Sequence, residues 1–420
     1  MKKLRSYGVA LIVAALLAAC GGGDPDVPGS VSPSGAPTTA PAGGFKSIVS
    51  FGDSLSDVGA YLPATSVTGD GAPPYIGGKF TTNINQTIPG VSSNQAKVWV
   101  ENLAASLGLL ITPAEVGFNG QSQTCPAAAV GLATTCTGYG QGGARVTDPN
   151  GIGKNPATGT GALTVPVKTQ IANHVANTQV TTQGKFRDND LIVVWAGHND
   201  VLVQFGAFAA SAADIRTQEA AGTITANQAN ALLLNAQTAA QTQMKAAALE
   251  LAGYVKTEIL AKGGKYVVVM NLLDFGDTPF GNSPQVLPAK GVLSGLSEIF
   301  NLWLTEGLKN QPVQLVDAAS VLEDVIASPA TYGFSNVIQP SCDVARIKTI
   351  TGDMVTDGSS LFCNATPGAP FAAINGLTSG ADPNTWLFAD SVHPTTGGHA
   401  AISDVIRAKL VSFGWLPAGQ

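Results

Sequence analysis

Four short apolar runs rich in Val and Ile recur along the chain, and each is followed within two residues by Gly or Asp. The runs are 47–51, 191–195, 266–272 and 313–316. Continuous apolar runs of this length are typical of buried parallel strands. Helical patterns lie around them, at 93–107, 225–262, 293–308 and 397–412. The alternation predicts an α/β protein, a three-layer α/β/α sandwich with a central parallel sheet, in which ligands bind beyond the carboxyl ends of the strands.

The composition excludes several classes of protein. Of the 420 residues, 45% are apolar and 12% are charged, so the chain is far too apolar to be disordered throughout. The 49 Gly and 25 Pro residues exclude a coiled coil and predict long, turn-rich loops. The formal net charge is −6, and it would be −9 without the three cations of residues 1–19. This balance makes nucleic acid an unsuitable partner.

The N-terminus has the layout of a secretory signal peptide over residues 1–19. Lys2, Lys3 and Arg5 precede an apolar run at 9–19 that is too short for a lasting membrane span. The run ends in Leu-Ala-Ala-Cys, which resembles the lipobox of bacterial lipoproteins; an ordinary signal peptide with a chance cysteine is the alternative. The resemblance implies that Cys20 is acylated and becomes the first mature residue. Two or three acyl chains would hold the protein on a membrane, and the residue after Cys20 resembles that of lipoproteins sent to the outer membrane.

Two further regions follow the signal peptide. Residues 20–44 form a Gly-, Pro-, Ser- and Thr-rich segment with no periodic apolar pattern, which predicts a flexible tether. Residues 45–420 contain no internal repeat, so we expect one folded domain.

Four cysteines remain besides Cys20, an even number that suits an oxidising compartment. They are Cys125, Cys136, Cys342 and Cys363. Four cysteines allow three pairings, and the short loops favour Cys125 with Cys136 and Cys342 with Cys363. A zinc site is disfavoured, because neither pair has close spacing or a neighbouring histidine.

A serine, Ser54, follows the first predicted strand within a tight turn, which is a suitable position for a nucleophile. A serine hydroxyl needs a base to take its proton and a third group to orient that base. His393 has an aspartate, Asp390, three residues before it, so one loop can carry both groups. His174 and His399 have no such paired context.

Negative charge that develops on a substrate oxygen needs donors aimed at it beforehand. Asn199 follows the second predicted strand and offers a side-chain amide. The glycine-rich segment 139–145 offers backbone N–H groups that can approach a substrate closely. With the N–H of Ser54, the sequence contains three candidate donors.

These motifs together resemble the GDSL esterase/lipase family of the SGNH hydrolase superfamily, whose fold is flavodoxin-like. The four blocks of the family occur in order, at 52–54, 142–144, 197–200 and 390–393. By this resemblance Ser54 is the nucleophile, His393 the base and Asp390 its partner. The resemblance also makes Gly142 and Asn199 oxyanion donors beside the Ser54 amide. The register of the glycine block leaves Gly143 open as the donor in place of Gly142.

Other residues near these blocks are expected to be structural. His198 occupies the variable position of the third block, and we expect it neither to bind a metal nor to catalyse. Asp57 and Asp200 are expected to hydrogen-bond to turns. Trp195, on a predicted buried strand, is expected to lie in the core.

The resemblance implies a carboxylic ester hydrolase that works through a serine acyl-enzyme on an acyl ester or lipid. The G-x-S-x-G elbow of other lipases is absent, as are the P-loop, dinucleotide and HExxH motifs, so we expect no metal and no cofactor. Two alternatives remain: a polysaccharide O-deacetylase on the same fold, and a non-catalytic lipoprotein that binds lipid or glycan. Substrate choice is expected to reside in the insertions at 61–92, 116–164 and 339–385.

Overall fold

The computed structural model describes residues 35–66, 78–85, 94–353, 355–366 and 375–418. The predicted signal peptide, Cys20 and the first part of the predicted tether therefore lie outside the described residues. The last part of that tether contacts the domain, since the Trp415 indole N–H donates to the carbonyl of Pro37 (2.7 Å) and Pro41 is buried. No helix in the described part of the chain is long and apolar enough to cross a membrane.

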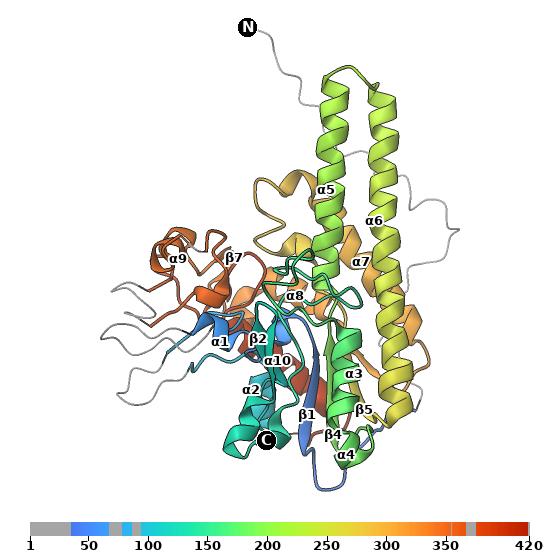
Figure 1. The fold of residues 1–420 in the computed structure, drawn as a ribbon, viewed down its shortest axis with the longest axis vertical. Helices are drawn as coiled ribbons and strands as arrows, with labels where there is room; N and C mark the ends of the chain where they lie inside the picture. Colours follow the sequence, from blue (N-terminus) through green and yellow to red (C-terminus); the bar gives the residue numbers. More distant parts are fainter. Residues whose placement is uncertain (1–34, 67–77, 86–93, 354, 367–374, 419–420) are drawn as a thin grey trace.

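A parallel sheet of four strands forms the centre of the domain (Figure 1). The strands, in their order across the sheet, are β1 (Ser47–Gly52), β4 (Asp190–Trp195), β5 (Tyr266–Met270) and β6 (Gln314–Val316). Every residue of β1, β4 and β5 is buried, which explains their continuous apolar runs. All four predicted strands are confirmed, with ends that differ by a few residues.

The free edge of β1 pairs with residues 137–139, which belong to none of the four predicted strands. The Ser50 N–H donates to the carbonyl of Thr137 (3.0 Å), and the Tyr139 N–H donates to the carbonyl of Ser50 (2.8 Å). The chain therefore adds to the sheet first on one side of β1 and then, from β4 onward, on the other side. The strand order reverses between β1 and β4, and a ligand site is expected at their carboxyl ends.

Helices cover both faces of the sheet, so the predicted α/β/α sandwich is confirmed (Figure 1). One face carries α2 (Trp99–Ser106), α8 (Ala318–Ala327) and α10 (Thr396–Ser412), and the other carries α3 (Val167–Asn177) and α6 (Ala226–Tyr254). Along α6 lie α5 (His198–Ala220) and α7 (Lys290–Leu308). The ends of α5 and α6 extend together beyond the rest of the domain as a helical hairpin (Figure 1).

Two predicted helices differ in extent from those observed. The helix expected over 93–107 begins only at Trp99, because the Glu101 carboxylate accepts the Val98 N–H (3.0 Å) and so caps the helix there. The helix expected over 225–262 is α6 followed by a π-helical turn, η6 (Val255–Ile259), and a 3-10 turn, η7 (Leu260–Lys262). A capping box between Thr225 and Gln228 fixes its start.

Smaller elements decorate this framework. They are α1 (Leu62–Thr65), α4 (Gln179–Thr182), α9 (Val344–Ile350), β2 (Glu115–Phe118), β3 (Gln121–Thr124), β7 (Asn336–Pro340) and β8 (Trp386–Phe388). Disulfides join Cys125 to Cys136 and Cys342 to Cys363, as the short loops favoured.

The ring of His174 lies in an aromatic cluster on the α3 side of the sheet. It stacks on Phe186 with ring centroids 4.5 Å apart, and it meets Phe51 and Tyr139 edge to face. Neither ring nitrogen has a hydrogen-bond partner among the described residues. Burial, reinforced by the charge of Arg187, lowers the pKa of His174 to about 4. The side chain is therefore a neutral core ring, in agreement with its lack of a paired context in the sequence.

We expect His174→Phe to remove a loss of stability at acidic pH. Histidine in the unfolded chain has a pKa of about 6.5, so between that pH and about 4 only the unfolded chain binds the extra proton. The free energy of unfolding of the wild type should therefore fall across this window as the pH is lowered. Urea unfolding measures this free energy at pH 7 and at pH 4.5. Between these two values, it should fall by on the order of 1–3 kcal/mol more in the wild type than in the variant. Equal pH dependence of the two proteins would contradict this account.

Candidate active site

The turn after β1 presents Ser54 at the carboxyl edge of the sheet. Gly52 permits this turn, because a Cβ at that position would lie 2.3 Å from the carbonyl oxygen of Trp195. The Asp53 carboxylate accepts the N–H of Leu55 (3.1 Å) and caps a 3-10 turn, η3 (Ser54–Ser56). The Ser54 side chain thus stands at the predicted nucleophile position, and the residue keeps 8% of its surface exposed.

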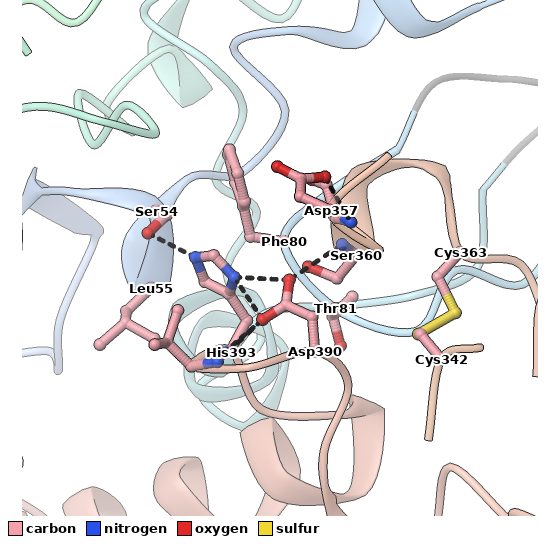
Figure 2. Close-up of polar contacts among 12 residues, drawn as sticks. Ser54, Leu55, Phe80, Thr81, Cys342, Asp357, Ser360, Cys363, Asp390 and His393 are labelled. Carbon is pink, nitrogen blue, oxygen red and sulfur yellow. Dashed lines mark hydrogen bonds and ion pairs between the residues drawn. A yellow bond between two sulfur atoms is a disulfide. The ribbon is translucent and has the colours of Figure 1, made fainter. Parts of the chain in front are cut away.

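The loop after β8 brings His393 and Asp390 to this serine (Figure 2). The His393 Nε2 atom lies 2.8 Å from the Ser54 Oγ atom, and its Nδ1 atom lies 2.8 Å and 2.9 Å from the two carboxylate oxygens of Asp390. The Ala389 N–H donates to the carbonyl of His393 (2.7 Å), which closes the loop on itself. The three residues that the sequence selected are therefore in the arrangement of nucleophile, base and orienting carboxylate.

The environment of Asp390 keeps its carboxylate ionised. Burial opposes ionisation, but the His393 ring and hydrogen bonds from His393, Ser360 and the Val392 N–H outweigh burial and hold the pKa of Asp390 well below its usual range. An ionised Asp390 accepts a proton-bearing Nδ1 and so directs the lone pair of the neutral ring's Nε2 toward Ser54. This geometry suits the His393 ring to accept a proton from the Ser54 hydroxyl.

Asn199 reaches the same edge from the first turn of α5. The chain turns after β4 at Gly197, which has a φ of +120° and where a Cβ would lie 2.5 Å from the Phe300 ring. The Asn199 amide donates to the carbonyl of Ala144 (2.9 Å), which holds it against the glycine-rich segment. Asp200 fastens the same segment, since it accepts hydrogen bonds from the Arg145 side chain and the Val146 N–H (both 3.0 Å).

The glycine pair differs from the first-choice prediction. The Gly142 N–H donates to the Asp57 carboxylate (2.9 Å), so it is not free to bind a substrate oxygen. Gly143 has a φ of +77°, and its N–H has no acceptor among the described residues. These contacts favour the alternative register, in which Gly143 and not Gly142 supplies the donor.

Asp57 is held entirely by backbone donors. It accepts the N–H groups of Gly59, Ala60 and Gly142, in keeping with the structural role predicted for it. Burial, only partly offset by these hydrogen bonds and the charge of Lys79, raises the pKa of Asp57 to about 6. The carboxylate therefore fixes the glycine segment relative to the nucleophile turn.

Phe80 is a neighbour of the site that the sequence did not single out. Its ring centroid lies 4.9 Å from that of His393, and a Cβ on Gly142 would lie 2.1 Å from its Cζ atom. A side chain at position 142 would therefore displace the Phe80 ring from its place beside His393. His399 holds this segment in place, because its Nε2 atom hydrogen-bonds to the carbonyl of Phe80 (3.2 Å). No sequence pattern predicts that Phe80 contacts His393, because the two residues are distant in the chain.

His198 pairs with the residue that precedes the nucleophile. Its Nδ1 atom lies 2.9 Å from the Asp53 carboxylate, and its Nε2 atom accepts the Leu273 N–H (3.4 Å). The ring is buried, stacks on Phe275 and meets Trp195, which is itself 1% exposed in the core as predicted. His198 thus supports the turn of Ser54 without touching the three residues.

Within the described ranges, no group of three or more His, Cys, Asp or Glu side chains is placed to hold a metal ion. The expectation that the protein needs no metal or cofactor remains a prediction from the sequence motifs.

Comparison with known proteins now adds to this geometry. The sequence profile described as GDSL-like Lipase/Acylhydrolase matches residues 48–406. The chain belongs to this family. Phosphatidylcholine-sterol acyltransferase of Aeromonas hydrophila is 23% identical over 388 residues, which cover 86% of this chain and 88% of that protein. Esterase EstA of Pseudomonas aeruginosa and esterase EstA of Pseudomonas putida are each 31% identical over 155 residues, 36% of this chain and 20% of theirs.

Family membership and the esterase relatives make this GDSL protein a hydrolase that acts on esters. The aligned part of the EstA proteins is only a fifth of their length, so their other regions have no counterpart in the match. The match at 48–406 includes both Ser54 and His393.

Proposed function

We propose that the protein hydrolyses carboxylic esters through an acyl-enzyme on Ser54. The observation that carries the proposal is the continuous hydrogen-bonded series from Asp390 through His393 to Ser54, with distances of 2.8–2.9 Å. A nucleophile, a base and an orienting carboxylate in this order have the geometry that acyl transfer requires. A lipoprotein that only bound lipid or glycan would not need this geometry.

The reaction has two halves. Ser54 Oγ attacks the ester carbonyl while His393 Nε2 takes the serine proton, and the resulting imidazolium is stabilised by Asp390. The tetrahedral intermediate collapses, the bond to the alcohol breaks, and His393 returns the proton to the departing alcohol. Water then repeats the sequence on the acyl-enzyme, which releases the acid and restores the Ser54 hydroxyl.

Three donors would stabilise the negative oxygen of each tetrahedral intermediate. They are the N–H groups of Ser54 and Gly143 and the second amide hydrogen of Asn199. Removing one such donor typically costs about 100-fold to 1000-fold in rate. The contacts of Gly142 with Asp57 and of Asn199 with Ala144 support this set, since they hold the segment and the amide in fixed positions.

A second candidate is transfer of the acyl group to an alcohol other than water. The relative that covers 86% of this chain carries the name of an acyltransferase, which favours this candidate. The same acyl-enzyme serves both reactions, because only the second nucleophile differs. Product analysis with and without an added long-chain alcohol separates hydrolysis from transfer: a new ester indicates transfer, and free acid alone indicates hydrolysis.

We also propose that Cys20 carries acyl chains that anchor the exported protein to a membrane, with the outer membrane as the expected location. Support comes from the basic residues and apolar run before Cys20 and from the Gly- and Pro-rich segment after it.

Ser54→Ala should abolish ester turnover and leave the fold intact. With p-nitrophenyl esters from acetyl to palmitoyl, we expect kcat/KM to fall by on the order of 10⁴-fold or more, because the nucleophile is lost. Ser391→Ala is the matched control, since this exposed serine lies in the His393 loop. A Ser54→Ala protein with near-normal activity would overturn the proposal. Preference for short acyl chains would keep the deacetylase alternative, whereas preference for long chains would indicate a lipase.

Cys20→Ser should release the protein from the membrane. Fractionation of a Gram-negative bacterial host, with detection of the full chain, should place the wild type in the membrane fraction and the variant in the soluble fraction. Mass spectrometry of the wild-type N-terminal peptide should show the added acyl chains. A wild type without acyl mass, or a wild type found in the soluble fraction, would contradict the anchor.

A further inference from the structure

This inference deepens the proposed function and rests on it. It starts from a fourth residue that contacts the triad, Ser360. The Ser360 N–H donates to the Oδ2 atom of Asp390 (2.9 Å), while the Oδ1 atom accepts the N–H groups of Val392 and His393 (Figure 2). Ser360 is fully buried and begins a short 3-10 turn, η11 (Ser360–Phe362). Besides His393 Nδ1, which lies 2.8 Å away, the oxygen Oδ2 therefore has a backbone donor from outside its own loop.

A disulfide ties the turn of Ser360 to Cys342, and a hydrogen bond joins Cys342 to the loop that the turn supports. Cys363 ends this turn and is bonded to Cys342, and the Cys342 N–H donates to the carbonyl of Ala389 (2.9 Å). Ala389 directly precedes Asp390. The disulfide and the Ser360 hydrogen bond thus close one ring around the carboxylate, as Figure 2 shows.

Asn83 supplies the non-covalent half of this support. It is fully buried, and its amide donates to the carbonyls of Ser360 (2.9 Å) and Cys363 (3.0 Å). Its backbone exchanges hydrogen bonds with Cys363 and Ala365. The same short segment carries Phe80, which packs on the His393 ring. The disulfide-bonded turn and the Phe80 segment therefore form one unit behind the base.

We propose that Ser360 is a positioning residue for the reaction and that the Cys342–Cys363 disulfide keeps its N–H on Asp390. Hydrogen bonds from backbone N–H groups fix the direction of a carboxylate and spread its charge. Without the Ser360 donor, Oδ2 loses its hold from outside the loop, and His393 is aimed less well at Ser54. A misplacement of about 1 Å at such a site can cost about 100-fold in rate.

Ser360→Pro removes the donor and, because the proline Cδ takes the place of the N–H hydrogen, also displaces the Oδ2 atom of Asp390. Proline lacks the N–H, and it is tolerated at the first position of a helical turn when the preceding residue is extended, as Ser359 is with a ψ of 129°. We expect kcat to fall about 10-fold to 100-fold with KM changed by less than about threefold. The acidic limb of the pH–rate profile should move to higher pH. A carboxylate with one donor fewer carries more negative charge and therefore stabilises the protonated form of His393 more strongly. Ser359→Ala is the control, since it lies next to the same turn and leaves the Ser360 N–H in place, and it should behave like the wild type.

Removal of the disulfide tests the tether. Cys342→Ala/Cys363→Ala should lower kcat about tenfold or more and shift the acidic limb in the same direction. Cys125→Ala/Cys136→Ala is the matched control, because it also removes one disulfide but none of its described hydrogen bonds involves the triad. Activities are compared below the thermal midpoint of each variant, so that all proteins are folded.

The outcomes separate the two proposals. A wild type that does not react with a fluorophosphonate at Ser54 overturns the proposed function, and this inference with it. A reactive wild type whose Ser360→Pro variant keeps the normal kcat and pH profile overturns the positioning role alone. Equal losses in the two disulfide variants would assign the effect to general stability and overturn the tether.

Discussion

The hydrogen bond between the Ser54 hydroxyl and the His393 ring joins residues that are 339 positions apart in the chain. Each residue lies shortly after the end of a strand, Ser54 after β1 and His393 in the loop that follows β8. The end of β1 is locked by Gln170, whose side chain accepts the Gly52 N–H (2.9 Å) and donates to the Gly52 carbonyl (2.7 Å). The His393 loop is locked at its far side by Thr395, which caps α10. The site therefore joins the end of the central sheet to the loop that follows the separate two-stranded sheet of β7 and β8.

The buried carboxylates at this edge of the sheet are stabilised by different partners. Asp390 faces an imidazole and several N–H groups, which keep its pKa low. Asp200 is buried too, which raises its pKa, and the guanidinium of Arg145 offsets part of that cost. Among the described residues, Asp57 has only backbone donors at hydrogen-bond distance, and its pKa rises to about 6. Asp57 and Asp200 both hold the glycine-rich segment, whereas Asp390 holds the His393 ring.

The sequence predicted the central sheet well, because strands buried on both faces leave continuous apolar runs. It also selected Ser54, His393 and Asp390, since residues of these types can carry such chemistry and lie in recognisable motifs. It did not predict α5, a 23-residue helix whose buried residues lie mostly in its first half. The outer half stands away from the core and has no periodic apolar face. The sequence also did not predict the contact of Ser360, because every residue type except proline has a backbone N–H. It left the register of the glycine pair open, because that register depends on the position of Asp57 in the fold.

The most direct test of the account is a crystal structure of the protein after reaction with an alkyl phosphonate, which mimics the tetrahedral intermediate. The account predicts a covalent bond to Ser54 Oγ and a phosphoryl oxygen within about 3 Å of the Ser54 N–H, the Gly143 N–H and the Asn199 amide. His393 should remain hydrogen-bonded to Asp390. A phosphonate bound to another residue, or a phosphoryl oxygen directed away from all three donors, would contradict it.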